Sequence, residues 1–375
     1  MRLRKSWIAV LVAALGSMFG AASTPAQTAE TPPDFPRGRI SGYIWADAYY
    51  NLAGDPAHRY NSSGADSANQ LLDGSFASSG QPRLIGRDLN GVLIRRIYFQ
   101  HDADLSIKYS TRFRLEVDSK SLTSDGKLGV NIKGAHFQAK GVIPRGTFLV
   151  GVLSTPIWET SEEAWAYRSI ERTIADFRGL GGSADIGLQM KGYADDGHKV
   201  GYNLMVGNGL GQKPENNRYK KIYFSLPLRP TGDLTIEPYA DYEWAAGGTD
   251  LATYKLFLGY DMRKMSLGAE LVDRVTHATS GPNKEPFGIS FFGRYRAGGK
   301  VKLFARYDRF QPNTRAASRV DADLYIAGID WSPYRDVFIM PNVMTTQYRA
   351  RGTADAPSHH DMQARVTFHV KFSKP

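Results

Sequence analysis

The 375-residue sequence contains no cysteine. It can therefore form no disulfide, offers no thiolate nucleophile and has no cysteine ligand for a metal ion. Packing and hydrogen bonds must stabilise the fold, and functions that depend on thiol chemistry are excluded.

Long apolar runs are also scarce. One extends from Trp7 to Ala22, after the basic residues near Arg2 and before small residues that end near Ala26. This arrangement predicts a secretory signal peptide over residues 1–26, followed by a short segment over 27–39. Beyond it there is no run of about 18 apolar residues, which excludes a helical membrane protein. The exported chain is then either a soluble fold or a closed β-barrel.

What the sequence does contain is alternation of apolar and polar residues. From Met362 to Phe372 the apolar residues occupy every second position, and Arg365, His369 and Lys371 lie between them. This is the period of a β-strand with one apolar and one polar face. The pattern predicts about 16 strands close to the length that crosses a bilayer at a tilt. The predicted ranges are 40–52, 92–102, 106–118, 131–140, 146–154, 184–193, 199–207, 219–226, 234–246, 251–261, 265–275, 287–296, 301–310, 324–331, 337–349 and 362–372.

Short and long connections alternate between these strands. Residues 141–145 and 263–264 are tight connections, whereas 155–183 and 350–361 are long. Outer-membrane barrels have short periplasmic turns and longer extracellular loops, and a soluble β-sandwich has no reason to show this regularity. The sequence therefore predicts an all-β fold, a transmembrane antiparallel β-barrel over residues 40–375.

Several aromatic-rich strings resemble the phosphate-selective (polyphosphate-type) porins in their order along the chain. The strings are Arg95-Arg96-Ile97-Tyr98-Phe99 and residues 110–116, 167–181, 185–192 and 201–209. The resemblance implies a 16-stranded barrel in the outer membrane of a Gram-negative bacterium, in contact with lipid and lipopolysaccharide. It also implies a homotrimer through which small anionic or polar solutes diffuse. In porins the loop after the fifth strand folds inward, so residues 155–183 are predicted to form a constriction loop.

Strand parity and this loop supply the candidate pore residues. The polar face of so wide a barrel is its lumen, and the net charge of +10 indicates an excess of basic residues. Rings of basic side chains favour anions, while acidic residues on the same face should keep the selectivity modest. Phosphate and other oxyanions are possible solutes. The candidates are Arg96, Arg112, Arg114, Lys191, Lys221, Arg294, Arg296, Lys302, Arg306, Arg365 and Lys371 on the strands, and Glu159, Glu162, Glu163, Arg168 and Arg172 on the loop.

The roles of the loop charges, of Arg95 and of several aromatic residues need separate interpretation. The loop charges either set up a transverse field against the basic wall or pair with each other and with the wall. Parity places Arg95 on the apolar face unless a β-bulge redirects it. Tyr43, Trp45 and Tyr98 are interpreted as interfacial girdle residues rather than as a sugar-binding slide.

Other function classes find little support in the sequence. It has no Gly-x-Ser-x-Gly elbow and no His-Glu-x-x-His motif, so we predict no enzymatic activity, no cofactor and no metal site. His359 and His360 next to Asp361 have no further ligand at a suitable spacing. The basic residues are dispersed, which argues against nucleic-acid binding. The alternatives are a channel with a saturable anion site, a barrel enzyme, and a structural or adhesive surface protein.

Overall fold

The computed structural model describes residues 34–55, 85–244, 248–279 and 281–374, without the side chains of 119 and 120. The described residues from Pro36 onward belong to one compact unit. The predicted signal peptide and residues 27–33 lie outside the described residues, as does most of the connection between the first two strands.

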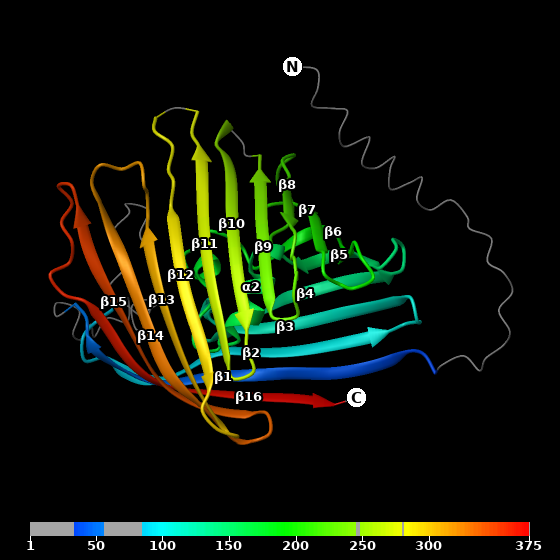
Figure 1. The fold of residues 1–375 in the computed structure, drawn as a ribbon, viewed down its shortest axis with the longest axis horizontal. Coiled ribbons are helices and arrows are strands. Elements are labelled where there is room, and N and C mark those ends of the chain that lie inside the picture. The colour runs from blue at the N-terminus through cyan, green and yellow to red at the C-terminus, as the bar shows by residue number, and fades with distance from the viewer. Residues whose placement is uncertain (1–33, 56–84, 245–247, 280, 375) are drawn as a thin grey trace, which may run out of the picture. The chain divides into compact units, whose positions relative to one another are not determined.

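Sixteen antiparallel strands close into one barrel (Figure 1). Each strand pairs with its neighbours in sequence, and β1 pairs with β16 from Ile40↔Lys374 to Ala53↔Met362. This pairing closes the ring and satisfies both edges of the sheet, so the predicted barrel is confirmed. The strands are β1 (Arg37–Ala53), β2 (Asn90–Asp104), β3 (Tyr109–Leu122), β4 (Leu128–Lys140), β5 (Gly146–Ser154), β6 (Ala184–Tyr193), β7 (Gly201–Gly207), β8 (Lys221–Ser225), β9 (Leu234–Glu243), β10 (Asp250–Asp261), β11 (Met265–His277), β12 (Phe287–Arg296), β13 (Val301–Gln311), β14 (Arg319–Tyr334), β15 (Val337–Arg351) and β16 (Asp361–Lys374).

The predicted strand boundaries are least accurate at β14. The sequence predicts 324–331, but the strand already begins at Arg319. Val320 and Ala322 alternate with Asp321 and Asp323 in this stretch, so the period-two pattern continues beyond the predicted strand. Residues 320–324 are all buried. At β3 the strand begins at Tyr109 rather than Ser106. Ser106 Oγ accepts the backbone N–H groups of Lys108 and Tyr109 at 3.2 and 3.1 Å and holds the preceding turn.

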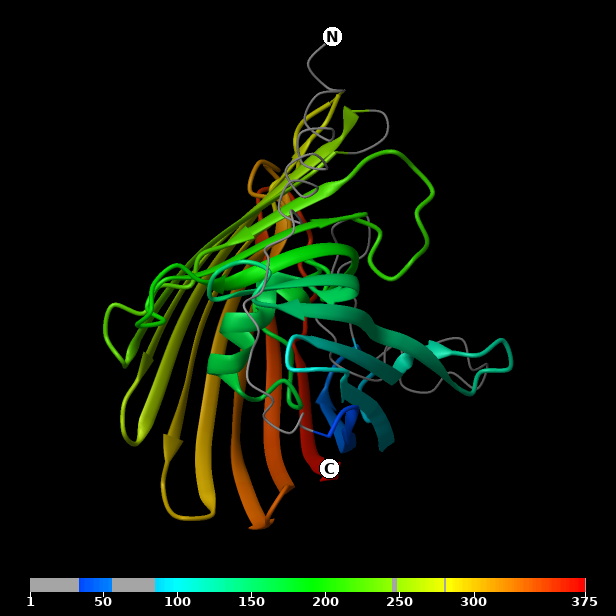
Figure 2. The same ribbon diagram turned by 90° about the vertical axis from the view of Figure 1, so that its right-hand side faces the viewer.

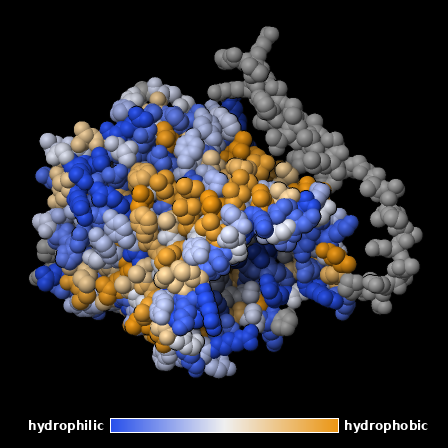
Figure 3. All heavy atoms as spheres, in the orientation of Figure 1, coloured by the Kyte–Doolittle hydropathy of each residue, from blue (hydrophilic) through white to orange (hydrophobic). Residues whose placement is uncertain are grey.

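The barrel is polar inside and apolar outside. On β16, Gln363 and Thr367 are completely buried, whereas Phe368 and Phe372 are 41% and 43% exposed. Figure 3 shows hydrophobic residues gathered across the middle of one face, with hydrophilic residues towards its edges. This inverted arrangement is typical of a barrel whose outer surface contacts lipid.

The two ends of the barrel differ in their connections. Even-numbered strands are followed by short connections such as 141–145 and 335–336, and β1 begins and β16 ends on the same side. We call this the turn end. The opposite side, the loop end, carries the longer connections such as 208–220, with 123–127 and 244–249 as short exceptions.

Residues 155–183 fold into the barrel, as predicted, and are called the inward loop. They contain α2 (Pro156–Trp165) and α3 (Ile174–Phe177), and Figure 2 shows α2 enclosed by the strands. The helix α2 begins at a proline, which suits a first-turn position, and ends where Ala166 adopts a φ of 62°. At the base of the loop the Thr155 hydroxyl donates a hydrogen bond to the Gly182 carbonyl.

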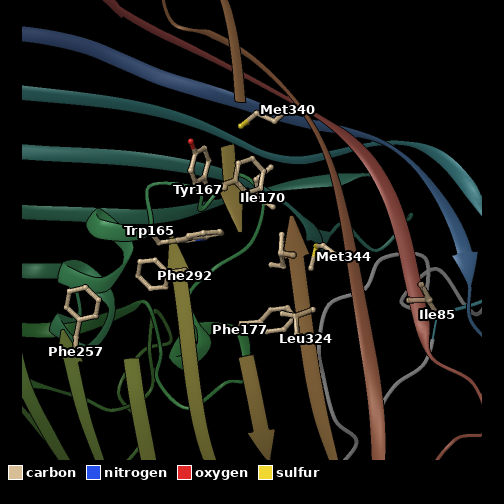
Figure 4. Close-up of a cluster of buried hydrophobic side chains, with 12 residues drawn as sticks. Ile85, Trp165, Tyr167, Ile170, Phe177, Phe257, Phe292, Leu324, Met340 and Met344 are labelled. Carbon is tan, nitrogen blue, oxygen red and sulfur yellow. The ribbon is translucent and has the colours of Figure 1, made fainter. Parts of the chain in front are cut away.

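The inward loop has an apolar core of its own against the barrel wall. Trp165 is 1% exposed, and its ring centroid lies 5.3 Å from that of Phe292 and 6.0 Å from that of Phe304. Figure 4 shows Trp165 next to Phe292, with Tyr167 and Ile170 nearby. Burial of such large rings contributes several kcal/mol, on the order of 1.5–3 kcal/mol for each large apolar side chain. The loop is therefore a packed element of the fold.

Candidate functional site: the constricted pore

The inward loop divides the lumen into two walls. The helix α2 contacts β7 to β12 and α3 contacts β11 and β12, while the Tyr167 hydroxyl donates to Asp330 on β14 at 3.1 Å. We call β7–β14 the packed wall. The lumen face of β2–β6 is called the open wall, because several of its charged side chains keep part of their exposure.

Charged residues on the packed wall are buried beneath the loop. Lys255 and Glu237 form a 2.7 Å ion pair in which both side chains are fully buried. Lys255 also donates to the Ile157 carbonyl of the loop, and Thr160 donates to Glu237 at 2.9 Å. These contacts fasten α2 to the barrel.

Three of the predicted pore residues share this buried environment. Lys221 lies 3.2 Å from Asp241, and Arg306 pairs with Asp308 while it donates to the Arg172 carbonyl. Arg365 on β16 donates to the Ile170 carbonyl at 3.3 Å. Their exposed fractions are only 4%, 3% and 3% respectively, so none of them faces the free lumen. Arg306 and Arg365 hold the loop, whereas Lys221 pairs with acids of β9.

The charges of the inward loop mostly pair within the loop itself. Arg168 lies 2.6 Å from Glu162 and 2.7 Å from Asp176, and Arg172 lies 3.5 Å from Asp176. Burial opposes ionisation of Asp176, but Arg168 and Arg172 hold its pKa below the usual value. The pairing interpretation therefore accounts for these charges.

Two loop acids on α2 remain available to the lumen. The Glu159 side chain is 30% exposed and lies 3.7 Å from Lys191 of the open wall, and Asn203 also donates to it at 3.3 Å. Glu163 is exposed. The loop side of the passage is thus mildly acidic.

A β-bulge redirects Arg95 into the lumen. In the pairing of β1 with β2, Trp45 faces Arg96 and the next residue, Ala46, faces Ile94, so Arg95 is skipped. Its guanidinium donates to the carbonyls of Ser169 and Ile170 at 3.0 and 2.6 Å. Of the two positions considered for Arg95 in the sequence, the structure therefore shows the second, in which a β-bulge turns the side chain into the lumen.

A second bulge does the same for Lys133. Between β3 and β4, Arg114 faces Gly134 and Leu115 faces Ile132, which leaves Lys133 unpaired in the ladder. Its Nζ lies 3.2 Å from Glu116 and 3.1 Å from Ser183 Oγ at the end of the inward loop. Sequence analysis missed Lys133 as a lumen residue. Its neighbour Gly134, a residue common at bulges, was the available signal.

The open wall carries a network of basic residues. Arg96 lies 2.9 Å from Glu116 and 2.8 Å from Asp118, and Arg112 lies 2.6 Å from Asp102. Arg114 donates to the side-chain amide oxygen Oε1 of Gln100 at 2.6 Å. The Arg112 and Lys191 side chains are 38% and 41% exposed, so this wall offers accessible positive charge.

The remaining predicted residues lie towards the turn end. The Arg294 side chain is 30% exposed and 4.0 Å from Asp261, and the Lys302 side chain is 41% exposed and 3.3 Å from Asp330. Arg296 and Lys371 are exposed. These residues form a basic rim at this end of the lumen.

The lumen also contains aromatic residues that sequence analysis assigned elsewhere. Trp45 and Tyr98 are each 5% exposed, and Tyr43 stacks on Trp45 with ring centroids 4.6 Å apart. The girdle interpretation of these three residues is wrong, because they share the lumen face with Arg96. Their positions in the apolar–polar alternation of the strands were the sequence signal that could have placed these residues on the lumen face.

The described residues contain neither a helix long and apolar enough to span a bilayer nor a group of three potential metal ligands. Asp361 accepts hydrogen bonds from the Tyr348 hydroxyl at 2.7 Å and from the Ile85 backbone at 3.4 Å.

Comparison with known proteins shows the fold. No family model and no curated protein matches the sequence. Among solved structures, the outer-membrane channel DcaP of Acinetobacter baumannii is similar with a TM-score of 0.64 and 11% identity over 90% of this chain and 97% of that one. The anion-selective porin from Comamonas acidovorans has a TM-score of 0.61 and 13% identity over 90% and 100%. The OmpT of Vibrio cholerae has a TM-score of 0.59 and 11% identity over 90% and 98%. The chain therefore has a porin fold.

Proposed function

We propose that this chain is a porin of the outer membrane of a Gram-negative bacterium. It provides a passive, water-filled passage for small hydrophilic solutes and ions and favours anions modestly. The observation that carries this proposal is the asymmetric lumen. The inward loop packs on one wall and leaves a partly exposed basic wall on the other, where Arg112 and Lys191 keep 38% and 41% of their side-chain exposure.

The anion preference follows from the charges that solutes would meet. Basic side chains lining a narrow passage attract anions, and the low-dielectric wall focuses their field. Most of these cations already have a carboxylate close by, as Arg112 has Asp102 at 2.6 Å. Their field is therefore partly cancelled, which supports a modest preference rather than absolute selectivity.

Orientation and assembly belong to the same proposal. The turn end faces the periplasm and the loop end faces the outside, because periplasmic turns are short in such barrels. The apolar outer surface contacts membrane lipid, and the loop end contacts lipopolysaccharide. We also propose a homotrimer, by analogy with the porins that the chain resembles. The ordered aromatic strings, which resemble those of the phosphate-selective porins, support phosphate as one of the permeating anions in this proposal.

Bilayer electrophysiology tests the proposal. Purified protein in a planar bilayer should give steady conductance steps, and the reversal potential under a KCl gradient should favour chloride. Folded, inserted protein that conducts no current would contradict the porin function. A reversal potential that favours potassium would contradict the anion preference alone.

A further inference from the structure

A cluster of aromatic rings lines the lumen near the turn end. Tyr43 on β1 faces Tyr98 on β2 and Lys371 on β16 in the strand register. The Tyr43 centroid lies 4.6 Å from that of Trp45, with nearly parallel rings at 12°, and 4.5 Å from that of Tyr98. His369 meets Tyr43 and Trp45 edge-on at 5.6 Å. The cluster presents fixed ring surfaces rather than separate interfacial side chains.

Two cations border this cluster without a carboxylate partner. The Arg114 guanidinium lies 5.0 Å from the centroid of the Tyr98 ring, and its one side-chain hydrogen bond goes to the neutral Gln100. The Lys371 ammonium lies 5.1 Å from the Phe338 ring. Within the part of the chain that the structure describes, neither cation has an ion pair, unlike Arg96 and Arg112 on the same wall.

A cavity of about 300 Å³ connects the two features. Its lining includes Tyr43, Tyr98, Arg114, Lys371, Ser41 and Ser373. One acid, Asp336, also lines it, but its carboxylate lies 3.4 Å from Arg335. The cavity therefore combines excess positive charge, hydroxyl groups and aromatic surface in one place.

We propose that this cavity binds small aromatic carboxylates on their way through the pore. The carboxylate takes the place between Arg114 and Lys371, where charge-assisted hydrogen bonds are available. The ring of the solute packs on Tyr43 and Tyr98, since aromatic rings favour offset or edge contacts with one another. Inorganic anions can use the two cations but have no apolar surface with which to displace water from the rings.

This inference rests on the proposed porin function and names a solute class for it. A binding subsite at the periplasmic end would make transport of such acids saturable, whereas other small anions would pass by simple diffusion. A neutral sugar could pack on the aromatic rings but would leave the two cations without an anionic partner. The chemistry of the cavity thus favours ring-bearing acids over both sugars and inorganic ions.

Current block in a planar bilayer tests the subsite. Benzoate, cyclohexanecarboxylate and acetate are added in turn at constant ionic strength. Benzoate should reduce the single-channel current saturably and more strongly from the turn end, cyclohexanecarboxylate should block more weakly, and acetate should act only as a permeant anion. Equal behaviour of benzoate and acetate would overturn the proposal.

Matched variants locate the effect. R114Q and K371Q should each raise the half-blocking concentration of benzoate by about tenfold, the change expected for the loss of one charge-assisted hydrogen bond. R263Q removes an exposed cation at the same end, in the turn between β10 and β11 and outside the cavity, and should leave the half-blocking concentration unchanged. An equal loss in R263Q would reduce the effect to general electrostatics and overturn the inference.

The porin function and the subsite can be contradicted separately. Absence of any KCl conductance would contradict the porin function, whereas normal conductance without benzoate block contradicts only the subsite. If R114Q does not fold, K371Q still decides, because Lys371 is exposed and has no ion pair within the described residues.

Discussion

Lys221 on β8 and Lys191 on β6 both lie on the lumen side of the barrel, but their surroundings differ. The Lys221 side chain is 5% exposed and lies 3.2 Å from Asp241. The Lys191 side chain is 41% exposed and lies 3.7 Å from Glu159 of the inward loop. Position on the polar face of a strand therefore determines that a side chain points into the barrel. Packing inside the barrel determines whether that side chain is exposed to solvent.

The same difference separates the two walls as a whole. On the packed wall, Lys255 and Arg306 are buried with their partners and attach the loop to the barrel. On the open wall, Arg112 and Lys191 keep exposure and can act on passing ions. Substitutions of buried residues that contact the loop, which include Arg95 at the bulge of β2, should therefore change stability. Substitutions of exposed basic residues should change selectivity.

The largest effect is expected from breaking the buried pair on the packed wall. Lys255→Met leaves Glu237 buried without its 2.7 Å partner, and such a loss costs about 3–5 kcal/mol of unfolding free energy. Urea unfolding followed by tryptophan fluorescence in lipid vesicles measures it. The double variant K255M/E237Q removes both charges and should recover much of the loss. A single variant as stable as the parent would refute the fastening role.

A smaller effect on stability, with a larger one on gating, is expected at the first bulge. Arg95→Ala removes two hydrogen bonds to the inward loop and leaves Glu171, 3.4 Å away, without this cation. The cost should be about 1–3 kcal/mol, and the loop should fluctuate enough to make single-channel currents flicker. The adjacent Arg96→Ala, which removes contacts to strand residues only, should weaken anion preference without flicker. Identical records from the two variants would show that the bulge has no special role.

Acidification should loosen the loop at low pH only. Burial opposes ionisation of Glu171, but Arg95, Arg172 and Arg365 hold its pKa below the usual value, and the pKa of Asp176 is lowered by its arginines. A lowered folded-state pKa adds stability at neutral pH that is lost as the pH falls through that value. Flicker of the single-channel current should therefore appear only below about pH 4, where carboxyl groups with lowered pKa values become protonated. Onset of flicker between pH 6 and 7 would indicate that other titratable groups control the loop.

The smallest effect is expected for single charges on the open wall. A unit charge contributes about 1 kcal/mol at 4 Å in a water-like medium, so Arg112→Gln should lower the chloride-to-potassium permeability ratio a few-fold. Lys221→Gln on the packed wall should leave the ratio unchanged. Reversal potentials under a KCl gradient give both values. If K221Q shifts the ratio as much as R112Q, the distinction between the walls is lost.

The sequence predicts the barrel well because alternation extends through whole strands. Sixteen strands and their order follow from period and connection length, and the face of Arg96 or Arg365 follows from parity. The inward folding of residues 155–183 is what the resemblance to porins implies. Burial under the loop is not encoded in any single strand, so Arg365 and Arg306 could not be separated from Arg112. The bulges at Arg95 and Lys133 each break parity by one residue. Two arginines in succession and a neighbouring glycine were the available local signs.

The absence of native cysteine allows a direct test of the two-wall account. Lys191→Cys and Lys221→Cys each introduce the sole thiol of the chain, one per wall, and resistance to heat in detergent verifies that both variants are folded. A negatively charged, water-soluble methanethiosulfonate reagent is then applied while the single-channel current is recorded. We predict rapid modification of K191C with a change in current and no reaction of K221C. Rapid modification of K221C would contradict the two-wall account.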